Sequence, residues 1–293
     1  MEDDLIPADV RSRLRGLRLV PHRAVGRAGL GSHASRSRGS GLEFAQYRAY
    51  EAGDEPRLID WKLYARSDRA FVREAERDSP VALWIVIDTS ASMGQADAGR
   101  PGWSRLAAAK GLAACLAELA LAEGDRFGWV VLHGDTVALA VPAGGRRQRD
   151  RLHLDLGPVT AGGGFTPPER LAPLWDRIGP RDLVVVLSDL FDDAAVALTE
   201  RLAAAGREVL AVQLLTVAER DFPFAAGHRF TDPETGAAVP GDGAAMRAGF
   251  LARFGAAQAA LAARLAARGV AQAVYVLDEP LDAPLRALFA GPR

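Results

Sequence analysis

Residues 81–87 restrict the fold more than any other stretch, because all seven are apolar and Asp88 follows them directly. An uninterrupted apolar run of this length is typical of a strand buried on both faces, as in the middle of a parallel sheet. A glycine-containing break and a long Ala-rich stretch come next. Asp88, Ser90 and Ser92 are therefore expected on a strand-to-helix loop, where open α/β sheets bind ligands.

The three polar side chains of this loop suit a metal ion. One carboxylate and two hydroxyls at alternate positions can face the same way and offer hard oxygen ligands with a single negative charge, as Mg²⁺ prefers. Asp88 and Ser90 could instead only cap the following helix. The spacing of Asp88, Ser90 and Ser92 by itself leaves both interpretations open.

Beyond residue 81 the pattern alternates between strand and helix, which predicts a mostly parallel sheet with helices on both faces. Gly134-Asp135 joins two apolar runs and predicts a hairpin, hence one antiparallel edge strand. The expected strands are 81–88, 127–133, 183–188, 208–215 and 272–277. The expected helices are 103–123, 167–178, 193–205 and about 245–268, three of them stopped by a glycine.

Two further loops should share the sheet edge with Asp88. One holds three glycines and then Thr166, whose hydroxyl could cap the Pro-started helix, bind a metal, or do both. The other follows the apolar strand 183–188 and begins with Asp189. Two like charges at one sheet edge repel unless a cation lies between them, so the combination favours a metal site.

We divide the chain into three parts. Residues 1–39 form a basic N-terminal arm, since eight arginines and no acidic residue fall between Val10 and Leu42. Residues 40–78 form a segment of closely alternating aromatic and charged residues, expected to pack on the main domain through Arg–Asp pairs. Residues 79–293 form the α/β domain, with 218–243 as a surface insertion that folds into a small hairpin.

Composition narrows the class of protein. The net charge of −1 argues against a chain that binds nucleic acid through its overall charge. The single cysteine, Cys115, excludes an internal disulfide and suits a reducing compartment. No apolar run approaches the ~20 residues of a membrane span, and the acidic start lacks a signal-peptide pattern. We therefore expect a cytoplasmic protein.

These residues carry a resemblance to known families. Asp88, Ser90, Ser92, Thr166 and Asp189 resemble the metal-ion-dependent adhesion site of von Willebrand factor A-type domains at all five positions. The upstream sequence from Arg48 to Arg66, with Gly53-Asp54 and Ile59-Asp60-Trp61 at its centre, is similar to the bacterial family known as domain of unknown function fifty-eight. The resemblance covers residues 40–290. Many relatives begin with two membrane spans, so this chain resembles the soluble members.

The resemblance implies a function as well as a fold. In such domains the five residues bind Mg²⁺, with Mn²⁺ and Ca²⁺ as alternatives, and a partner protein supplies an Asp or Glu to the open coordination position. Genes of this family commonly lie beside a MoxR-type AAA+ ATPase. The implied function is a non-enzymatic adaptor or chaperone-type partner of that ATPase.

Two other functions compete with this one. The first is a Mg²⁺-dependent phosphatase with Asp88 as nucleophile and Asp189 or Asp192 on the metal. That chemistry normally uses a second carboxylate two residues after the nucleophile, where this chain has Ser90. The second is nucleic-acid binding through the basic arm, which holds few aromatic residues for base stacking.

Overall fold

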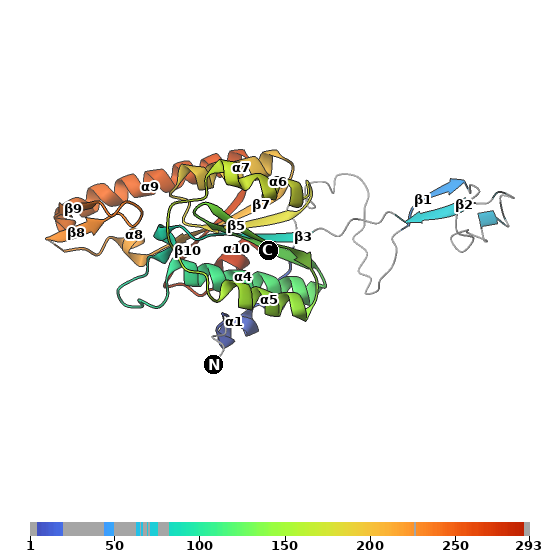
Figure 1. The fold of residues 1–293 in the computed structure, drawn as a ribbon, viewed down its shortest axis with the longest axis horizontal. Coiled ribbons are helices and arrows are strands. Elements are labelled where there is room, and N and C mark those ends of the chain that lie inside the picture. The colour runs from blue at the N-terminus through green and yellow to red at the C-terminus, as the bar shows by residue number, and fades with distance from the viewer. Residues whose placement is uncertain are drawn as a thin grey trace. The chain divides into compact units, whose positions relative to one another are not determined.

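The computed structural model describes residues 5–19, 44–49, 63–64, 66, 69, 71–75, 82–225 and 227–289. The chain divides into two units, one of residues 1–27 and 81–293 and the other of residues 28–80. The larger unit holds a six-stranded sheet in the order β10-β7-β6-β3-β4-β5 (Figure 1). The sheet is parallel except for the β4–β5 pair at one edge, so the predicted fold class is confirmed.

The strands fall close to the predicted ranges. They are β3 (Ala82–Asp88), β4 (Arg126–His133), β5 (Thr136–Ala143), β6 (Leu183–Ser188), β7 (Glu208–Leu215) and β10 (Ala271–Val276). β3 and β6 are buried along their whole length and lie side by side in the middle of the sheet. The predicted hairpin turns at Gly134, whose φ of 49° is in the left-handed region.

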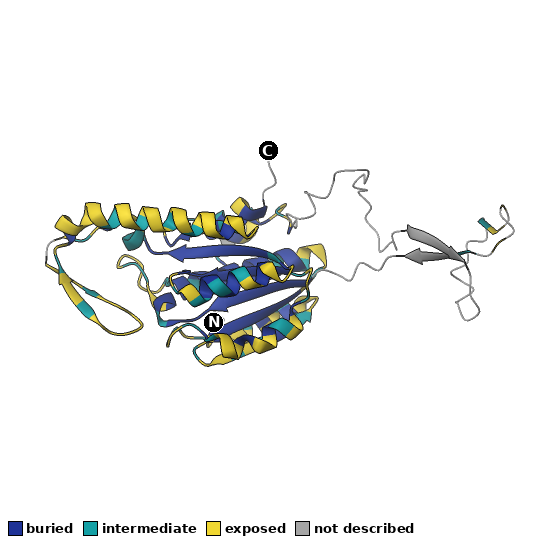
Figure 2. Cartoon of the chain, turned by 90° about the horizontal axis from the view of Figure 1, so that it is seen from above, coloured by how far each residue is buried: buried dark blue, intermediate teal, exposed yellow. Residues whose placement is uncertain are grey.

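Helices cover both faces of the sheet (Figure 1), and alternate residues of β3 pack in opposite layers. Leu83, Ile85 and Ile87 pack on one side and Trp84 and Val86 on the other. The first layer contains α4 (Arg105–Glu123), α5 (Arg146–Leu156) and α10 (Ala283–Phe289). The second contains η3 (Pro168–Leu171), α6 (Ala172–Arg177), α7 (Asp193–Ala204) and the end of α9 (Gly243–Ala267). Figure 2 shows the buried strands between helices whose outer faces are exposed.

The predicted surface insertion contains a short helix in addition to the expected hairpin. It contains the predicted hairpin, formed by β8 (His228–Thr231) and β9 (Ala238–Gly241), which pair antiparallel. It also contains α8 (Val217–Asp221), a short helix that begins with a capping box between Thr216 and Glu219. The first turns of α9 lie beside this hairpin (Figure 1).

The start of the chain differs from the predicted basic arm. Helix α1 (Ala8–Arg13) belongs to the larger unit, and Ile6, Val10 and Leu14 are buried in its core. These side chains recur every four residues, so they line one face of a helix while the arginines occupy the others. The many arginines of this segment led to the prediction of a basic arm, although the apolar residues between them form one buried face.

The smaller unit is described only in part. β1 (Phe44–Ala49) and β2 (Phe71–Ala75) form a two-stranded antiparallel sheet. The sequence of residues 71–77 predicts a strand, and β2 confirms it over Phe71–Ala75. The predicted Arg–Asp pairs between residues 48 and 66 lie outside the side chains that the structure describes.

Within the described ranges, no helix is both long and apolar enough to cross a membrane.

Replacing Ile6 with Ala should destabilise the whole larger unit, because Ile6 is 1% exposed and packs in the main core. A buried Ile→Ala substitution costs about 2–5 kcal/mol. Equilibrium denaturant unfolding measures the loss. The control is Arg15→Ala at an exposed position of the same segment, expected to stay within about 0.5 kcal/mol of wild type. Equal stabilities for the two variants would show that this segment does not pack on the core.

Candidate metal centre

Asp88 ends β3, and both of its carboxylate oxygens accept hydrogen bonds. Oδ1 accepts from the Ser90 backbone N–H at 2.9 Å, and Oδ2 accepts from Ser188 Oγ, on the neighbouring strand β6, at 2.7 Å. The residue is 2% exposed. Burial raises the pKa of the Asp88 carboxyl, the two hydrogen bonds oppose this rise, and the charge of Asp189 adds to it. A buried carboxylate in this state gains from a nearby cation.

Ser90 and Ser92 bring their hydroxyls together, as the alternate spacing predicts. They flank the start of the short helix η2 (Ala91–Gly94), and their Oγ atoms lie 3.1 Å apart. Both residues are buried. Ser90 makes no side-chain capping bond to η2, which leaves its second lone pair available.

Thr166 lies on a loop that is tied to the same edge of the sheet. Gly162 N–H donates to Thr89 O at 2.9 Å, and Ala91 N–H donates to Gly163 O at 2.8 Å. Gly163 has a φ of 68°, which explains the need for glycine there. The predicted capping role is not seen, because η3 has Pro167 as its N-cap and no capping hydrogen bond.

The Thr166 hydroxyl is the strongest indication that this site could bind a cation. The residue is fully buried, yet its Oγ1 has no hydrogen-bond partner among the described residues. A buried hydroxyl left unpaired costs about 1–3 kcal/mol. An oxygen held in this way fits a metal ligand, so the residues present are compatible with a bound cation.

Asp189 follows β6 and pairs with a residue that the sequence analysis missed. Arg105, the first residue of α4, donates from Nη1 to Asp189 Oδ2 at 2.7 Å and to Ser92 O at 3.0 Å. Its Nη2 pairs with Glu219 at the start of α8. The Arg105 and Asp189 side chains are 1% and 3% exposed, so they form a buried ion pair, while the Glu219 side chain is 22% exposed.

A sequence signal for Arg105 does exist. Basic side chains are disfavoured in the first turn of a helix, because the helix dipole is positive there. Arg105 occupies that turn, directly after the N-cap Ser104, in a helix otherwise rich in Ala and Leu. A charge placed against the dipole inside an apolar helix indicates that a specific acidic partner lies nearby.

The loop after Asp189 is conformationally strained. Leu190 has a φ of 56°, a region that non-glycine residues rarely occupy, at a cost of order 1–3 kcal/mol. Its N–H donates to Ser188 Oγ at 3.0 Å, while Gln213 Nε2 donates to Asp189 O at 3.0 Å. These hydrogen bonds stabilise the strained backbone conformation of Leu190 and fix Asp189 at the sheet edge.

In the part of the chain that the structure describes, no three His, Cys, Asp or Glu side chains are grouped as a metal site. A cation at this edge would depend on Asp88 and Asp189 together with the hydroxyls of Ser90, Ser92 and Thr166. That donor set is weakly charged and all oxygen, which suits Mg²⁺.

These observations define the class of protein: an α/β domain with an oxygen-rich, buried polar site at the carboxyl edge of its sheet. Residues 46–260 match the model of the family described as "Protein of unknown function DUF58". The match covers more than half of the chain, so the chain belongs to that family.

Known relatives and structures resemble the chain more distantly. Uncharacterized proteins of Mycobacterium tuberculosis (strain ATCC 25618 / H37Rv) and Mycobacterium bovis (strain ATCC BAA-935 / AF2122/97) are 27% identical over 247 residues, 80% of this chain and 74% of theirs. The conserved hypothetical protein BatB from Bacteroides thetaiotaomicron shares 16% identity over 72% of this chain and 96% of its own, with a TM-score of 0.43. The SpRpn10 VWA domain shares 12% identity over 70% and 93%, with a TM-score of 0.41.

Replacing Arg105 with Gln should destabilise the protein strongly, because it leaves the Asp189 and Glu219 carboxylates without their buried cation. Removing one partner of a buried ion pair costs about 3–5 kcal/mol. Arg264→Gln is the matched control, since Arg264 pairs with Glu200 on the surface at 2.9 Å, where such pairs contribute about 0–1 kcal/mol. Similar unfolding free energies for the two variants, measured by urea denaturation, would contradict this assignment.

Proposed function

We propose that this protein is a non-enzymatic, metal-dependent protein–protein interaction module. Asp88, Ser90, Ser92, Thr166 and Asp189 would hold a divalent cation, with Mg²⁺ preferred over Mn²⁺ and Ca²⁺. The observation that carries the proposal is the buried, unpaired Thr166 hydroxyl, on a loop tied by backbone hydrogen bonds to the loop of the paired Ser90 and Ser92 hydroxyls.

The donor set explains why such a metal would bind a partner. Two carboxylates and three neutral hydroxyls would leave the cation electron-poor, and Arg105 already neutralises part of the Asp189 charge. The cation would therefore gain from a further carboxylate, supplied by an Asp or Glu of another protein. That bond becomes strong once the surrounding interface excludes water.

The proposed partner is a MoxR-type AAA+ ATPase, towards which the protein acts as an adaptor or chaperone-type factor. Support for this partner comes from the family resemblance, in which the two genes commonly lie side by side, and from membership of that family.

An aspartyl phosphatase gains no support from the geometry at Asp88. Both oxygens of its carboxylate already accept hydrogen bonds, and the residue two positions later is Ser90, a poor proton donor. Hydrolysis of p-nitrophenyl phosphate that Asp88→Asn abolishes would favour the enzyme and overturn our proposal.

Mg²⁺ should stabilise the wild-type protein and not the Thr166→Val variant. Valine keeps the shape of threonine and removes the unpaired hydroxyl, so the metal-free variant should be at least as stable as wild type. A bound cation stabilises wild type by about 2.7 kcal/mol at a hundredfold excess over Kd. Thermal unfolding with Mg²⁺ or EDTA measures the difference.

The control is Thr199→Val, at another buried threonine whose Oγ1 donates to Ala195 O at 2.9 Å. It should lose about 1 kcal/mol with its hydrogen bond and keep the full response to Mg²⁺. An equal Mg²⁺ response in wild type and Thr166→Val would exclude Thr166 as a ligand.

Binding to the purified MoxR-type ATPase of the same genome should require both the metal and Asp88. Asp88→Asn keeps the size of the side chain and its acceptor for the Ser90 N–H, yet removes the charge that would hold the cation. We expect at least a tenfold weaker Kd for this variant, and for wild type in EDTA, by biolayer interferometry. Unchanged binding in both cases would contradict a metal-dependent contact.

A further inference from the structure

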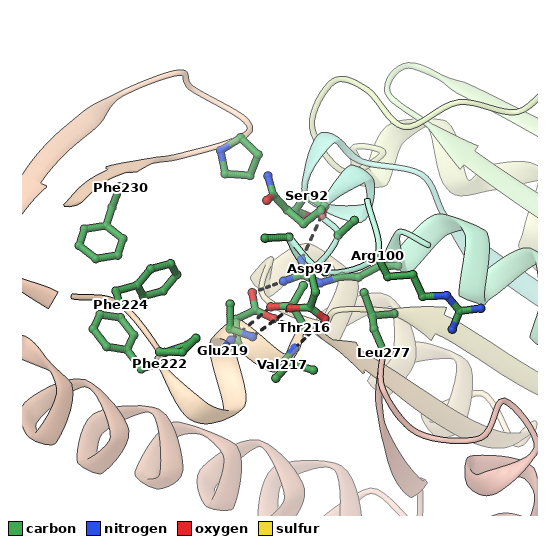
Figure 3. Close-up of a pocket in the computed structure, with 18 of the residues that line it drawn as sticks. Ser92, Asp97, Arg100, Thr216, Val217, Glu219, Phe222, Phe224, Phe230 and Leu277 are labelled. Carbon is green, nitrogen blue, oxygen red and sulfur yellow. Dashed lines mark hydrogen bonds and ion pairs between the residues drawn. The ribbon is translucent and has the colours of Figure 1, made fainter. Parts of the chain in front are cut away.

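A large pocket opens beside the candidate metal centre. Its volume is about 1100 Å³, and its walls come from the loop after η2, from α8 and the β8–β9 hairpin, and from the first turns of α9. Figure 3 shows Phe222, Phe224 and Phe230 on one side of this pocket and Arg100 on the other. All of these segments belong to the larger unit.

One wall of the pocket is aromatic. Phe222 is the centre of the cluster, with ring centroids 4.3 Å from Phe250, 5.0 Å from Phe224 and 5.6 Å from Phe230. Phe191, directly after the loop of Asp189, is 48% exposed and also lines the pocket. Phe222 is buried, while Phe224, Phe230 and Phe250 are half-buried and keep part of their rings accessible. Accessible aromatic surface rimmed by polar residues marks sites where a partner buries large side chains.

The three carboxylates that line the pocket have partners within the chain, and two of them pair with arginines. Asp97 accepts from the N–H groups of Val217 and Ala218, Glu219 pairs with Arg105, and Asp278 pairs with Arg220.

Two exposed arginines that line the pocket lack such partners among the described residues. Arg100 and Arg229 make no ion pair with any other described residue, and Arg100 stacks over the Trp103 ring at 4.6 Å. A ligand with negative charges beside large apolar groups therefore complements the pocket.

The pocket and the candidate metal centre share residues. Ser92 lines the pocket and offers one of the hydroxyls to the metal, while Arg105 lines the pocket and pairs with Asp189. A partner chain whose carboxylate reached the metal would therefore lie beside this pocket.

We propose that this pocket takes an acidic segment of a partner protein, which inserts a Trp, Phe or Leu side chain among Phe191, Phe224 and Phe230 and pairs its acidic residues with Arg100 and Arg229. The inference deepens the proposed function, on which it rests, by naming the chemistry that selects the partner. The metal would bind one carboxylate of the partner, and the pocket would bind the partner residues next to that carboxylate.

Selection from a displayed library of short random peptides on the immobilised full chain, in Mg²⁺, tests the proposal. We expect the enriched peptides to combine Asp or Glu with Trp, Phe or Leu. A synthetic copy of such a peptide should bind Phe191→Ser, Phe230→Ser and Arg229→Glu about tenfold more weakly than wild type. Circular dichroism checks that each variant is folded, and Phe191 is exposed enough to change safely.

Two variants serve as matched controls. Leu154→Ser changes a side chain on α5 that is 69% exposed, and Arg147→Glu changes an exposed arginine of the same helix. Both lie away from the pocket and should bind the peptide as wild type does.

Three results would overturn the proposal. They are enriched peptides that lack acidic residues or large apolar residues, equal affinity for wild type and all pocket variants, and self-association of the chain that Phe191→Ser abolishes and the peptide does not compete with. The last would assign the pocket to a second copy of this chain.

The Asp88→Asn variant separates this inference from the proposed function. If peptide binding requires the pocket residues but is unchanged by Mg²⁺ removal and by Asp88→Asn, the metal-dependent function is contradicted and the pocket proposal is supported. If peptide binding requires Mg²⁺ but is unchanged in every pocket variant, the metal-dependent function is supported and the pocket proposal is contradicted.

Discussion

The buried guanidinium of Arg105 is the interaction on which the functional edge of the sheet depends. It joins Asp189 at the end of β6, the Ser92 carbonyl on the loop after β3, and Glu219 at the start of α8. Three segments distant in the sequence therefore meet at one fixed cation. Burying Arg105 alone would be costly, and so would burying Asp189, but together they offset most of each other's dehydration.

The balance of charge at this edge favours a cation. The charge of Asp189 adds to the burial that raises the pKa of the Asp88 carboxyl, and the one guanidinium near Asp189, that of Arg105, is shared with Glu219. A cation between Asp88 and Asp189 would reduce the repulsion between these two carboxylates. The unpaired Thr166 hydroxyl would supply a neutral oxygen for such an ion, and the hydrogen bonds from Leu190 and Gln213 hold the loop of Asp189.

The sequence predicted the sheet and its ligand-bearing loops because these depend on local patterns. Apolar runs ending in Asp88 and Asp189 identified β3 and β6, and Gly134-Asp135 identified the antiparallel edge. Helix α5 escaped prediction because only Gln148, Leu152 and Leu156 of its eleven residues are buried, which is a weak periodic signal. Arg105 escaped because its role arises from Asp189 and Glu219, 84 and 114 residues away in the sequence.

The same contacts tie the metal centre to the aromatic pocket. One oxygen of Glu219 pairs with Arg105, while the other accepts the Thr216 N–H and closes the capping box of α8. The N–H groups of Val217 and Ala218, at the start of that helix, donate to Asp97 on the loop that follows η2. The start of α8, which lines the pocket, is thus held by hydrogen bonds to two carboxylates, and bonds to charged groups are stronger than bonds between neutral ones. Arg105 therefore connects Asp189 of the candidate metal centre to Glu219 of α8, which lines the pocket, through a single side chain.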